Sequence, residues 1–434
     1  MMNMPELRFP EFENDGEWVN EQFGKVYSFL VTNSFSREYL NYENGTVKNI
    51  HYGDIHTKFS TLFDITKESV PFINLDVPIE RIREECYCIE GDLIFADASE
   101  DMNDVGKSIE IVNLNKEKLL SGLHTLMARQ INKKIEIGFG GYLFKSEWIR
   151  KQIQREAQGA KVLGISAGRI STVMISYPRY PQEQQKIASC LSSLDELITA
   201  HSQKLELLKD HKKGVMQNLF PQEGETVPQY RFPEFENDEE WVEKKLGDIA
   251  ELTSSKRVHL ADYVSSGVPF FRGKEISQLK NNQFPDDILY ISNEQYKEIK
   301  DKYGVPKRGD ILITAVGTLG NVYCIKNDDE FYFKDGNLIW MKNISIDSYF
   351  LEVLLDVEKK KVLASAIGSS QKALTMAALN KIDFQIPKNP KEQQKIASCL
   401  SSLDALIKAQ AEKIEQLKLH KKGLMQGLFP KVAE

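Results

Sequence analysis

The sequence predicts an α+β fold: two globular α/β domains separated by two long antiparallel coiled-coil helices, in a pseudo-two-fold and circular arrangement. The main observation is an internal repeat, in which several sequence blocks of the first half of the chain recur in the second half. The octamer RFPEFEND occupies residues 8–15 and returns at 231–238, and the run EQQKIASCLSSLD fills 183–195 and returns unchanged at 392–404. A period of about half the chain is far longer than the repeats of solenoids. We therefore expect a duplicated molecule whose matched parts share one task and whose divergent parts have two.

Six parts follow one another along the chain. The order is leader, domain, helix, and then the same again, and the sequence stops four residues after the last LFP. A leader follows the first helix but not the second, and one stands at the N-terminus instead, so we expect the two ends of the chain to meet. The predicted limits are an acidic leader at 1–24, a first domain at 25–180, a first helix at 181–220, a linker and second leader at 221–246, a second domain at 247–390 and a second helix at 391–430.

The composition is that of a globular protein with acidic leaders. Hydrophobic residues make up 41% of the 434 residues, no apolar stretch approaches the ~20 residues needed to cross a membrane, and the first residues lack the apolar region of a signal peptide. The five cysteines form no CxxC pair, so reduced thiols in a cytoplasmic protein are expected. Residues 5–21 and 228–243 each hold six acids and one arginine, while the whole chain carries −7. The rest is therefore near +3, which leaves room for a basic surface on the divergent domains.

The repeated EQQKIA block begins the clearest helix signal. Proline at 181 and at 390 stands where a helix can start, and the following residues alternate in steps of four and three, the a/d pattern of a coiled coil. Each ladder has one polar layer at its middle, His201 in the first helix and Gln410 in the second, and an antiparallel pair would bring these layers together and fix the register. The alternative is two amphipathic helices that each pack on their own domain. The ladder positions are Ile187, Leu191, Leu194, Ile198, His201, Leu205, Leu208, Lys212, Val215 and Leu219, then Ile396, Leu400, Leu403, Ile407, Gln410, Ile414, Leu417, Lys421, Leu424 and Leu428.

The two divergent domains keep a few points of correspondence. Short β-like runs at 92–96, 310–314 and 322–325 alternate with turn signals. Residues 91–94 mirror 309–312, and Asp54-Ile55 mirrors Glu275-Ile276, which places His51 opposite Arg272. A glycine at 159 and one at 368 each stand nineteen residues before the proline that ends the domain. These matches predict the same fold with different surface residues.

The order of these blocks resembles a known family. Two variable domains, each followed by a helix of the P-x-E-QQ-KI-A type, are similar to the specificity subunit of type I restriction–modification systems. The second leader, with Trp241 and the run Lys245-Leu246-Gly247-Asp248, and the KKG-x-MQ-x-LFP helix end also resemble that family. The first leader departs slightly, with Phe23-Gly24-Lys25 where the second has Leu246-Gly247-Asp248. The resemblance covers essentially the whole chain.

The resemblance implies a subunit that performs no chemistry itself. Each target-recognition domain would read one half of a bipartite, asymmetric sequence in double-stranded DNA, and the paired helices would set the spacer between the halves. Two adenine methyltransferase subunits, which bind S-adenosylmethionine, would dock on the repeated helices, and restriction subunits, which use ATP and Mg²⁺, would join that core. No cofactor, metal or membrane contact is expected for this chain. A helix of thirty-odd residues is roughly 50 Å long, a suitable length for two half-sites about 34 Å apart.

Sequence-specific DNA contact needs side chains that match base edges, supported by contacts to phosphates. In the second domain the loop Ser254–Arg257 and the run that follows Gly368 stand out, and the latter resembles a glycine–glutamine loop of the family. The first-domain mates of Gln371 and Lys372 are Val162 and Leu163, so nearby cations are expected to substitute for them. For each residue the alternative is an ordinary solvated surface position. The candidates are Ser255, Lys256, Arg257, Arg272, Lys274, Thr318, Ser369, Ser370, Gln371 and Lys372 in the second domain, and Ser34, Arg37, His51, Lys58, Lys107, Lys161 and Arg169 in the first.

Two rival functions are an enzyme acting on DNA alone and a structural coiled-coil adaptor with no sequence preference. Pro285-Asp286 with Glu298-Ile299-Lys300 matches the PD…ExK pattern of nucleases, but residues 292–302 are typical of an amphipathic helix with a Ser cap, whereas a nuclease needs a core strand. His51 and His56 lack a third metal ligand, and the glycine run 138–141 lacks the framing of a cofactor loop. The sequence contains no P-loop lysine motif and no methyltransferase tetrapeptide. We therefore expect no catalytic and no metal site.

Overall fold

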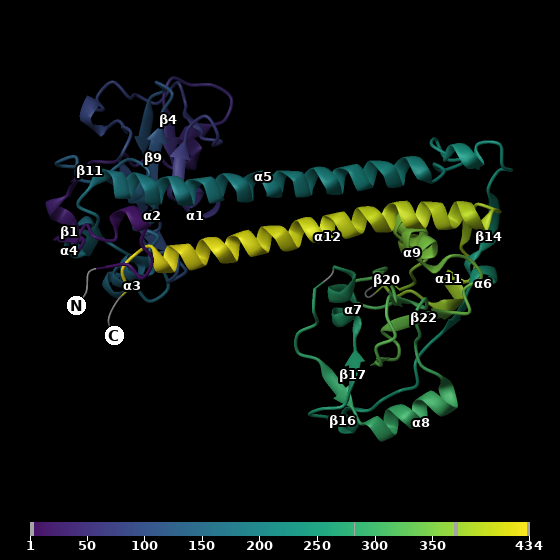
Figure 1. Cartoon of the computed structure of the whole chain (residues 1–434). Coiled ribbons are helices and arrows are strands. Elements are labelled where there is room, and N and C mark those ends of the chain that lie inside the picture. The colour runs from purple at the N-terminus through teal and green to yellow at the C-terminus, as the bar shows by residue number, and fades with distance from the viewer. Residues whose placement is uncertain (1–3, 282, 369–371, 432–434) are drawn as a thin grey trace. The chain divides into compact units, whose positions relative to one another are not determined.

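The computed structural model describes residues 4–281, 283–368 and 372–431 of the chain. They form two compact units, one of Met1–Ser202 with Lys413–Glu434 and one of Gln203–Glu412. Each unit contains one divergent domain, the first half of one long helix and the second half of the other. The long helices are α5 (Pro181–Leu219) and α12 (Pro390–Gly427), shown in teal and yellow in Figure 1. They begin at or beside the prolines that the sequence indicates, and the chain has the mixed α+β character predicted for it.

The first domain is built on two sheets. The larger has the strand order β2-β11-β7-β9-β5, and only the β5–β9 pair is parallel. The smaller has the order β10-β4-β6-β3, with β10 parallel to β4. The bounds are β2 Tyr27–Leu30, β11 Thr125–Gln130, β7 Leu93–Ala96, β9 Ser108–Asn113, β5 Leu62–Asp64, β10 Leu119–Ser121, β4 Lys48–Ile50, β6 Phe72–Ile73 and β3 Leu40–Asn41.

The second domain repeats this plan strand for strand, apart from β5. Its larger sheet runs β15-β22-β19-β20, all antiparallel, and its smaller sheet runs β16-β18-β17-β21, with β21 parallel to β17. Equal strand orders and directions confirm that the divergent domains share one fold. The bounds are β15 Glu251–Thr253, β22 Leu338–Lys342, β19 Ile311–Thr314, β20 Val322–Cys324, β16 Tyr263–Val264, β18 Leu289–Ile291, β17 Val268–Phe271 and β21 Tyr332–Phe333.

Helices and short ribbons complete both domains (Figure 1). Each leader adds a strand that pairs with the last strand of its domain, as β1 with β13 and β14 with β23. In the first domain the bounds are β1 Val19–Gln22, β13 Met174–Tyr177, β8 Ala98–Ser99 and β12 Leu163–Gly164, with helices α1 Tyr52–Thr57, α2 Phe139–Leu143, α3 Glu147–Glu156 and α4 Ala167–Thr172. In the second domain they are β14 Val242–Lys245 and β23 Asp383–Ile386, with helices α6 Leu246–Ile249, α7 Gly273–Lys280, α8 Asn293–Tyr303, α9 Ser348–Val357, α10 Lys359–Ala364 and α11 Met376–Leu379.

A buried ion pair fastens each leader to the start of a long helix. In the first unit Glu183 is 1% exposed and accepts hydrogen bonds from Arg8 Nε at 2.8 Å and Nη2 at 2.7 Å. Trp18 Nε1 donates to the same carboxylate at 3.2 Å. A carboxylate removed from water needs such charged and polar partners. This contact accounts for the repeated arginine, tryptophan and glutamate.

The second unit contains the same joint. Glu392 accepts from Arg231 Nε at 2.8 Å, from Arg231 Nη2 at 2.7 Å and from Trp241 Nε1 at 3.3 Å. Trp241 also packs edge-on against Phe220 and Phe350. The strict repeat therefore preserves a connection inside the protein, in addition to any surface that it presents.

The two ends of the chain meet in the first unit, as predicted. The backbone N–H of Leu7 donates to the carbonyl oxygen of Gly427 at 2.8 Å, and Lys431 pairs with Glu6 at 2.7 Å. Phe429 lies in the same apolar core as Trp18, with ring centroids 6.2 Å apart. The N-terminal leader thus occupies, at the end of α12, the place that the second leader occupies at the end of α5.

The predicted a/d stripe is the buried side of both long helices. Every ladder position is buried or half-buried, whereas Leu207 and Leu419, which lie off the stripe, are 68% and 71% exposed. Within the first unit Lys421 of α12 pairs with Asp195 of α5 at 2.5 Å, so the end of one helix lies beside the start of the other and the two run antiparallel there.

The second unit has the matching pair, Lys212 with Asp404 at 2.6 Å, in the same antiparallel sense. In each unit the aspartate of this ion pair also accepts a hydrogen bond from a tyrosine of the domain: Tyr142 donates to Asp195, and Tyr349 donates to Asp404. His201 is half-buried in the first unit and Gln410 is 8% exposed in the second. Their contact with one another across the helix pair stays a prediction.

A buried glutamate joins a helix to the large sheet in each domain. In the first, Glu110 of β9 accepts from the backbone N–H groups of Gly138 at 3.0 Å and Gly141 at 2.6 Å, at the start of α2. In the second the direction is reversed, because Glu352 of α9 accepts from the N–H of Cys324 in β20 at 3.0 Å. The glycine run 138–141 is thereby explained by packing, since a side chain at Gly141 would meet Leu62 at 2.9 Å.

Burial raises the pKa of Glu110 and of Glu352 to about 7, although the N–H donors act in the opposite direction. Both groups keep their protons in the folded state at a pH where the unfolded chain has lost them. Their contribution to stability is therefore full below the ordinary glutamate pKa and is lost as the pH rises through 7. At about 1.4 kcal/mol for each pKa unit, each group should cost on the order of 3 kcal/mol by pH 8.

Urea unfolding of the protein and of Glu110→Gln and Glu352→Gln, at pH 5 and pH 8, measures this effect. Each variant should lose less stability between the two pH values than the parent does. Substitution of the exposed Glu80 by glutamine is the matched control and should leave the pH dependence unchanged. Equal losses in parent and variants would contradict the assignment.

Candidate nucleic-acid interface

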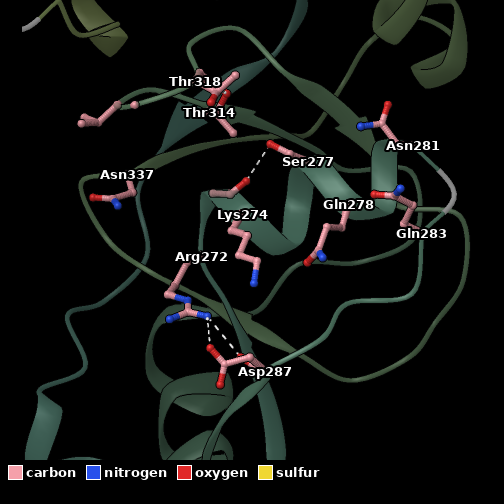
Figure 2. A pocket seen from close by; sticks show the side chains of 13 residues that line it. Arg272, Lys274, Ser277, Gln278, Asn281, Gln283, Asp287, Thr314, Thr318 and Asn337 are labelled. Atoms are coloured by element: carbon pink, nitrogen blue, oxygen red, sulfur yellow. Dashed lines mark hydrogen bonds and ion pairs between the residues drawn. The ribbon is translucent and has the colours of Figure 1, made fainter. Parts of the chain in front are cut away.

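A polar hollow of about 630 Å³ opens in the second domain and gathers three of the predicted DNA-contact residues, Arg272, Lys274 and Thr318 (Figure 2). We call it the amide hollow, because most of its other polar side chains are amides. Its lining is Arg272, Gly273, Lys274, Ser277, Gln278, Asn281, Gln283, Asp287, Thr314, Val316, Gly317, Thr318 and Asn337.

One wall of the amide hollow is α7, which a buried carboxylate holds in place. Glu275 is fully buried and accepts from the Arg272 backbone N–H at 2.7 Å and from Arg272 Nη2 at 2.6 Å. Burial opposes ionisation of Glu275, but these hydrogen bonds lower its pKa overall. The hydrogen bond with Glu275 in turn raises the pKa of Arg272. Arg272 also lies 3.6 Å from Asp287, so its charge is largely balanced within the protein.

The opposite wall is the turn between β19 and β20. Thr314 accepts from the N–H of Asn321 at 2.9 Å and donates to the carbonyl oxygen of Thr318. Asn321 Nδ2 donates to Ser277 Oγ at 2.9 Å, which ties this turn to α7. The turn is therefore fixed to the helix opposite, and Thr318 is held at the rim.

The predicted glycine–glutamine loop is anchored beside this turn. Ile367 and Ala373 form an isolated β-bridge, and the N–H of Leu374 donates to the carbonyl oxygen of Ala315 at 2.9 Å. Lys372 is exposed, whereas Ser369, Ser370 and Gln371 lie outside the described residues. The anchor places Ile367, Ala373 and Leu374 next to the strand end that lines the amide hollow.

Sequence reasoning missed the amides Gln278, Asn281, Gln283 and Asn337. Figure 2 shows Gln278, Asn281 and Gln283 on the α7 side and Asn337 across from them. An amide has a donor and an acceptor side by side, which matches the N6 and N7 groups of adenine in the major groove. Asn281 and Gln283 are exposed, while Gln278 donates to Asp286 at 3.0 Å. The signal in the sequence that could have indicated the amides of the α7 side is the polar run that follows Glu275-Ile276.

The loop Ser254–Arg257 reaches a neighbouring part of the same domain. Arg257 is 70% exposed at its side chain and pairs with Asp335 at 2.8 Å, on the loop that also contains Asn337. Lys256 Nζ lies 5.3 Å from the Tyr303 ring centre. Ser255 is different, because its hydroxyl oxygen is buried. The buried hydroxyl of Ser255 is less accessible than the two cations beside it, and the DNA contacts of all three residues stay predictions.

In the first domain four predicted residues gather around α1, the counterpart of α7. Arg37 and Lys58 both pair with the buried Asp54, at 2.7 Å and 3.1 Å. Lys107 donates to the carbonyl oxygen of His56 at 2.7 Å. Ser34 is exposed on the segment that leads to Arg37. The cations are held by the protein around α1, as Arg272 and Lys274 are held around α7 in the second domain.

Three other first-domain predictions have different outcomes. His51 is 8% exposed, its Nδ1 accepts from the N–H of Gly53 at 3.1 Å, and burial lowers its pKa. It is therefore a helix cap whose Nδ1 is engaged by the backbone, and its DNA contact stays a prediction. Arg169 bonds to the backbone and carboxylate of Glu156 at the end of α3, so its contacts are with α3 rather than α1. Lys161 is exposed on the loop that matches the glycine–glutamine loop, and its DNA contact stays a prediction.

The nuclease-like pattern does not form a site. Residues Asn293–Tyr303 are a helix whose Ser292 cap accepts from the N–H of Gln295 at 3.1 Å, as predicted. Lys300 pairs with Glu330 and Asp286 pairs with Lys274, so the members of the pattern point to different partners. Within the described residues no group of three or more His, Cys, Asp or Glu side chains could hold a metal ion. Across the same residues, no helix combines the length and apolar character needed to cross a membrane.

The sequence profile of the type I restriction modification DNA specificity domain matches residues 82–210 and 238–419. The chain belongs to this family. The matched segments contain most of each divergent domain and most of each long helix. The specificity-subunit resemblance of the repeated blocks is thereby confirmed, and the chain is a DNA target-recognition subunit rather than an enzyme.

Two archaeal relatives from Methanocaldococcus jannaschii support this assignment. The chain is 29% identical over 371 residues to a protein named as the MjaX specificity subunit of a type I restriction enzyme, with 81% of each chain covered. It is 26% identical over 335 residues to the type I restriction enzyme MjaVIII specificity subunit, with 75% of this chain and 76% of the relative covered. Both are named as specificity subunits.

A solved structure agrees on the fold. The S subunit of the type I restriction–modification system of M. genitalium matches with a TM-score of 0.62 at 15% identity, over 99% of this chain and 100% of the other. At this level of identity the match shows a shared fold.

Proposed function

We propose that each divergent domain reads one half of a bipartite, asymmetric sequence in double-stranded DNA. The observation that carries this proposal is that two domains of the same strand order present different side chains at the same place. The amide hollow lies at α7 in the second domain, and a cluster of cations and histidines lies at α1 in the first. Direct readout of bases depends on the pattern of side chains at the DNA surface, whereas the shared fold only positions those side chains. Two domains with the same fold and different surface side chains are suited to two half-sites of different sequence.

We further propose that the long helices set the unread spacer and bind two copies of one partner, an adenine methyltransferase subunit. Four residues on one side of α5 are exposed, and so are their identical counterparts on α12: Gln185, Ser189, Ser193 and Leu197, and Gln394, Ser398, Ser402 and Leu406. Internal packing does not require identical exposed side chains. Two equal partners would require them, and the small serines would allow a partner helix to approach closely.

Chemistry belongs, in this proposal, to the partners. The methyltransferase subunits would bind S-adenosylmethionine, and the restriction subunits, joined through them, would use ATP and Mg²⁺. Each long helix has 38 or 39 residues and is therefore about 57 Å long at 1.5 Å per residue. A strut of this length fits a spacer of about one DNA turn between half-sites.

Mapping of methylated adenines in genomic DNA tests the proposed function. Deletion of the gene should remove methylation from one bipartite motif of fixed spacing, and complementation should restore it. The motif should be asymmetric, because the two reading surfaces differ. Loss of no motif, or of a single uninterrupted motif, would contradict the proposal.

A further inference from the structure

The amide hollow of the second domain can be mapped onto the first domain by hydrogen bonds alone. In the second, the N–H of Ala315 donates to the carbonyl oxygen of Asn337 at 2.8 Å. In the first, the N–H of Asp97 donates to the carbonyl oxygen of His124 at 3.0 Å. The flanking strand pairs agree, because Thr125 lies opposite Ala96 as Leu338 lies opposite Thr314. His124 therefore occupies the position of Asn337.

The helix wall maps in the same way. In both domains a strand of the small sheet, β4 or β17, leads directly into the helix, and His51 and Arg272 are the caps. Counting from the caps, His56 takes the place of Ser277 and Tyr52 that of Gly273. The N–H of Ile165 donates to the carbonyl oxygen of Asp97 at 2.8 Å, as that of Leu374 does to Ala315. The positions that match Gly273, Ser277 and Asn337 in the lining of the amide hollow are thus occupied by Tyr52, His56 and His124.

Tyr52 is the centre of this group. Its ring centroid lies 4.7 Å from that of His51, 5.3 Å from that of His124 and 6.2 Å from that of His56. His56 Nε2 lies 3.0 Å from the carbonyl oxygen of Ala98. Three of the seven histidines of the chain meet at this tyrosine. Of the three, His124 has an exposed side chain, whereas His51 is buried and His56 is half-buried.

The backbone of His124 is itself unusual. Its φ is +55°, the left-handed region that non-glycine residues seldom adopt. Such conformations cost free energy and are concentrated at functional sites. Glycine would remove that cost, so a histidine at this position points to a use of its side chain. Its position matches that of Asn337, which lines the amide hollow of the second domain.

Asp97 fixes which nitrogen of His124 carries the proton. The carboxylate lies 3.1 Å from Nδ1, and because an ionised carboxylate can only accept, Nδ1 carries the proton. In the neutral ring Nε2 is then an acceptor. Exocyclic amines are the donors that bases present in the major groove, N6 of adenine and N4 of cytosine.

We propose that His124 is a specificity-determining residue of the first domain, which reads the exocyclic amine of adenine or cytosine through Nε2 while Tyr52 supports its ring. This assignment rests on the proposed function and adds to it the residue and the class of base. It also divides the two reading surfaces by chemistry, with an aromatic–histidine surface in the first domain and an amide surface in the second.

The test uses the full chain in its methyltransferase complex, at pH 8, with each variant mapped by sequencing of methylated sites. His124→Asn is the main variant, because asparagine tolerates the left-handed backbone, and His124→Ala is the second. Both should relax or change one base position of one half-site, with discrimination reduced on the order of tenfold, and leave the other half-site unchanged. Asn337→Ala is the matched control and should alter the other half-site only.

The outcomes distinguish a failure of the His124 assignment from a failure of the proposed function. If both His124 variants keep the parental motif while Asn337→Ala changes one half-site, the assignment of His124 is overturned and the proposed function stands. If the parent complex itself methylates no bipartite motif, the proposed function fails. A thermal unfolding midpoint equal to that of the parent shows that a changed motif reflects reading rather than folding.

Discussion

Replacement of Glu183 by alanine is expected to lower the free energy of unfolding by roughly 3–5 kcal/mol, the usual cost of breaking a buried ion pair. The substitution leaves the Arg8 guanidinium, whose side chain is 6% exposed, without its carboxylate, and it removes the acceptor of Trp18. The leader, the start of α5 and the core around Phe429 all meet here, so the first unit should loosen as a whole. Guanidinium unfolding of parent and variant measures the difference.

A surface pair on the same leader provides the control. Glu11 pairs with Lys186 at 3.2 Å, but both side chains are about half exposed. Exposed pairs contribute little to stability because solvent screens them, so Glu11→Ala should have little effect. Glu392→Ala in the second unit should repeat the result of Glu183→Ala. A small loss in both buried variants would show that the joint does not hold the leaders.

The elements that sequence could predict are those whose signal is local or repeated. The long helices were found from a 3–4 spacing that extends over more than thirty residues, and burial follows that spacing position by position. The shared fold of the two domains was predicted from a few matched points, such as residues 91–94 and 309–312, which are the strand starts of β7 and β19. In the first case the regular spacing of apolar residues was enough for the prediction, and in the second the repetition of short runs was enough.

The ion-pair joints between leader and helix and the surfaces proposed to read DNA could not be predicted from the sequence alone, because they bring together residues that are far apart in the chain. Glu183 and Arg8 are 175 positions apart, and repetition alone marked them as shared without showing that they touch. The sequence does not align His124 with Asn337, because the loop before His124 differs in length from its counterpart: three residues separate β10 from β11, but four separate β21 from β22. His51 was chosen as a reader because it stands opposite Arg272, yet only its backbone position is equivalent.

The two-unit organisation also goes beyond the sequence. The chain suggests helices as separate parts, whereas each compact unit combines the start of one helix with the end of the other. The ion pairs Lys421–Asp195 and Lys212–Asp404 occupy matching places in the two units. Each unit is therefore a domain on a two-helix base, built from distant parts of the chain.

Exchange of residues 25–180 for the matching region of a specificity subunit with another target should change one half of the methylated motif completely. The leader, both long helices and the second domain stay as they are, so the contacts of Glu183, Glu392 and the chain ends are retained. The spacer and the other half-site should therefore be those of the parent. This is the largest functional effect that the account predicts.

Sequencing of methylated adenines in cells that express the exchanged chain with its methyltransferase partner is the most direct measurement of the central claim, that two independent reading domains share one frame. The account predicts a hybrid motif, with one new half, one parental half and an unchanged spacer. A motif in which both halves change, or neither does, would contradict it.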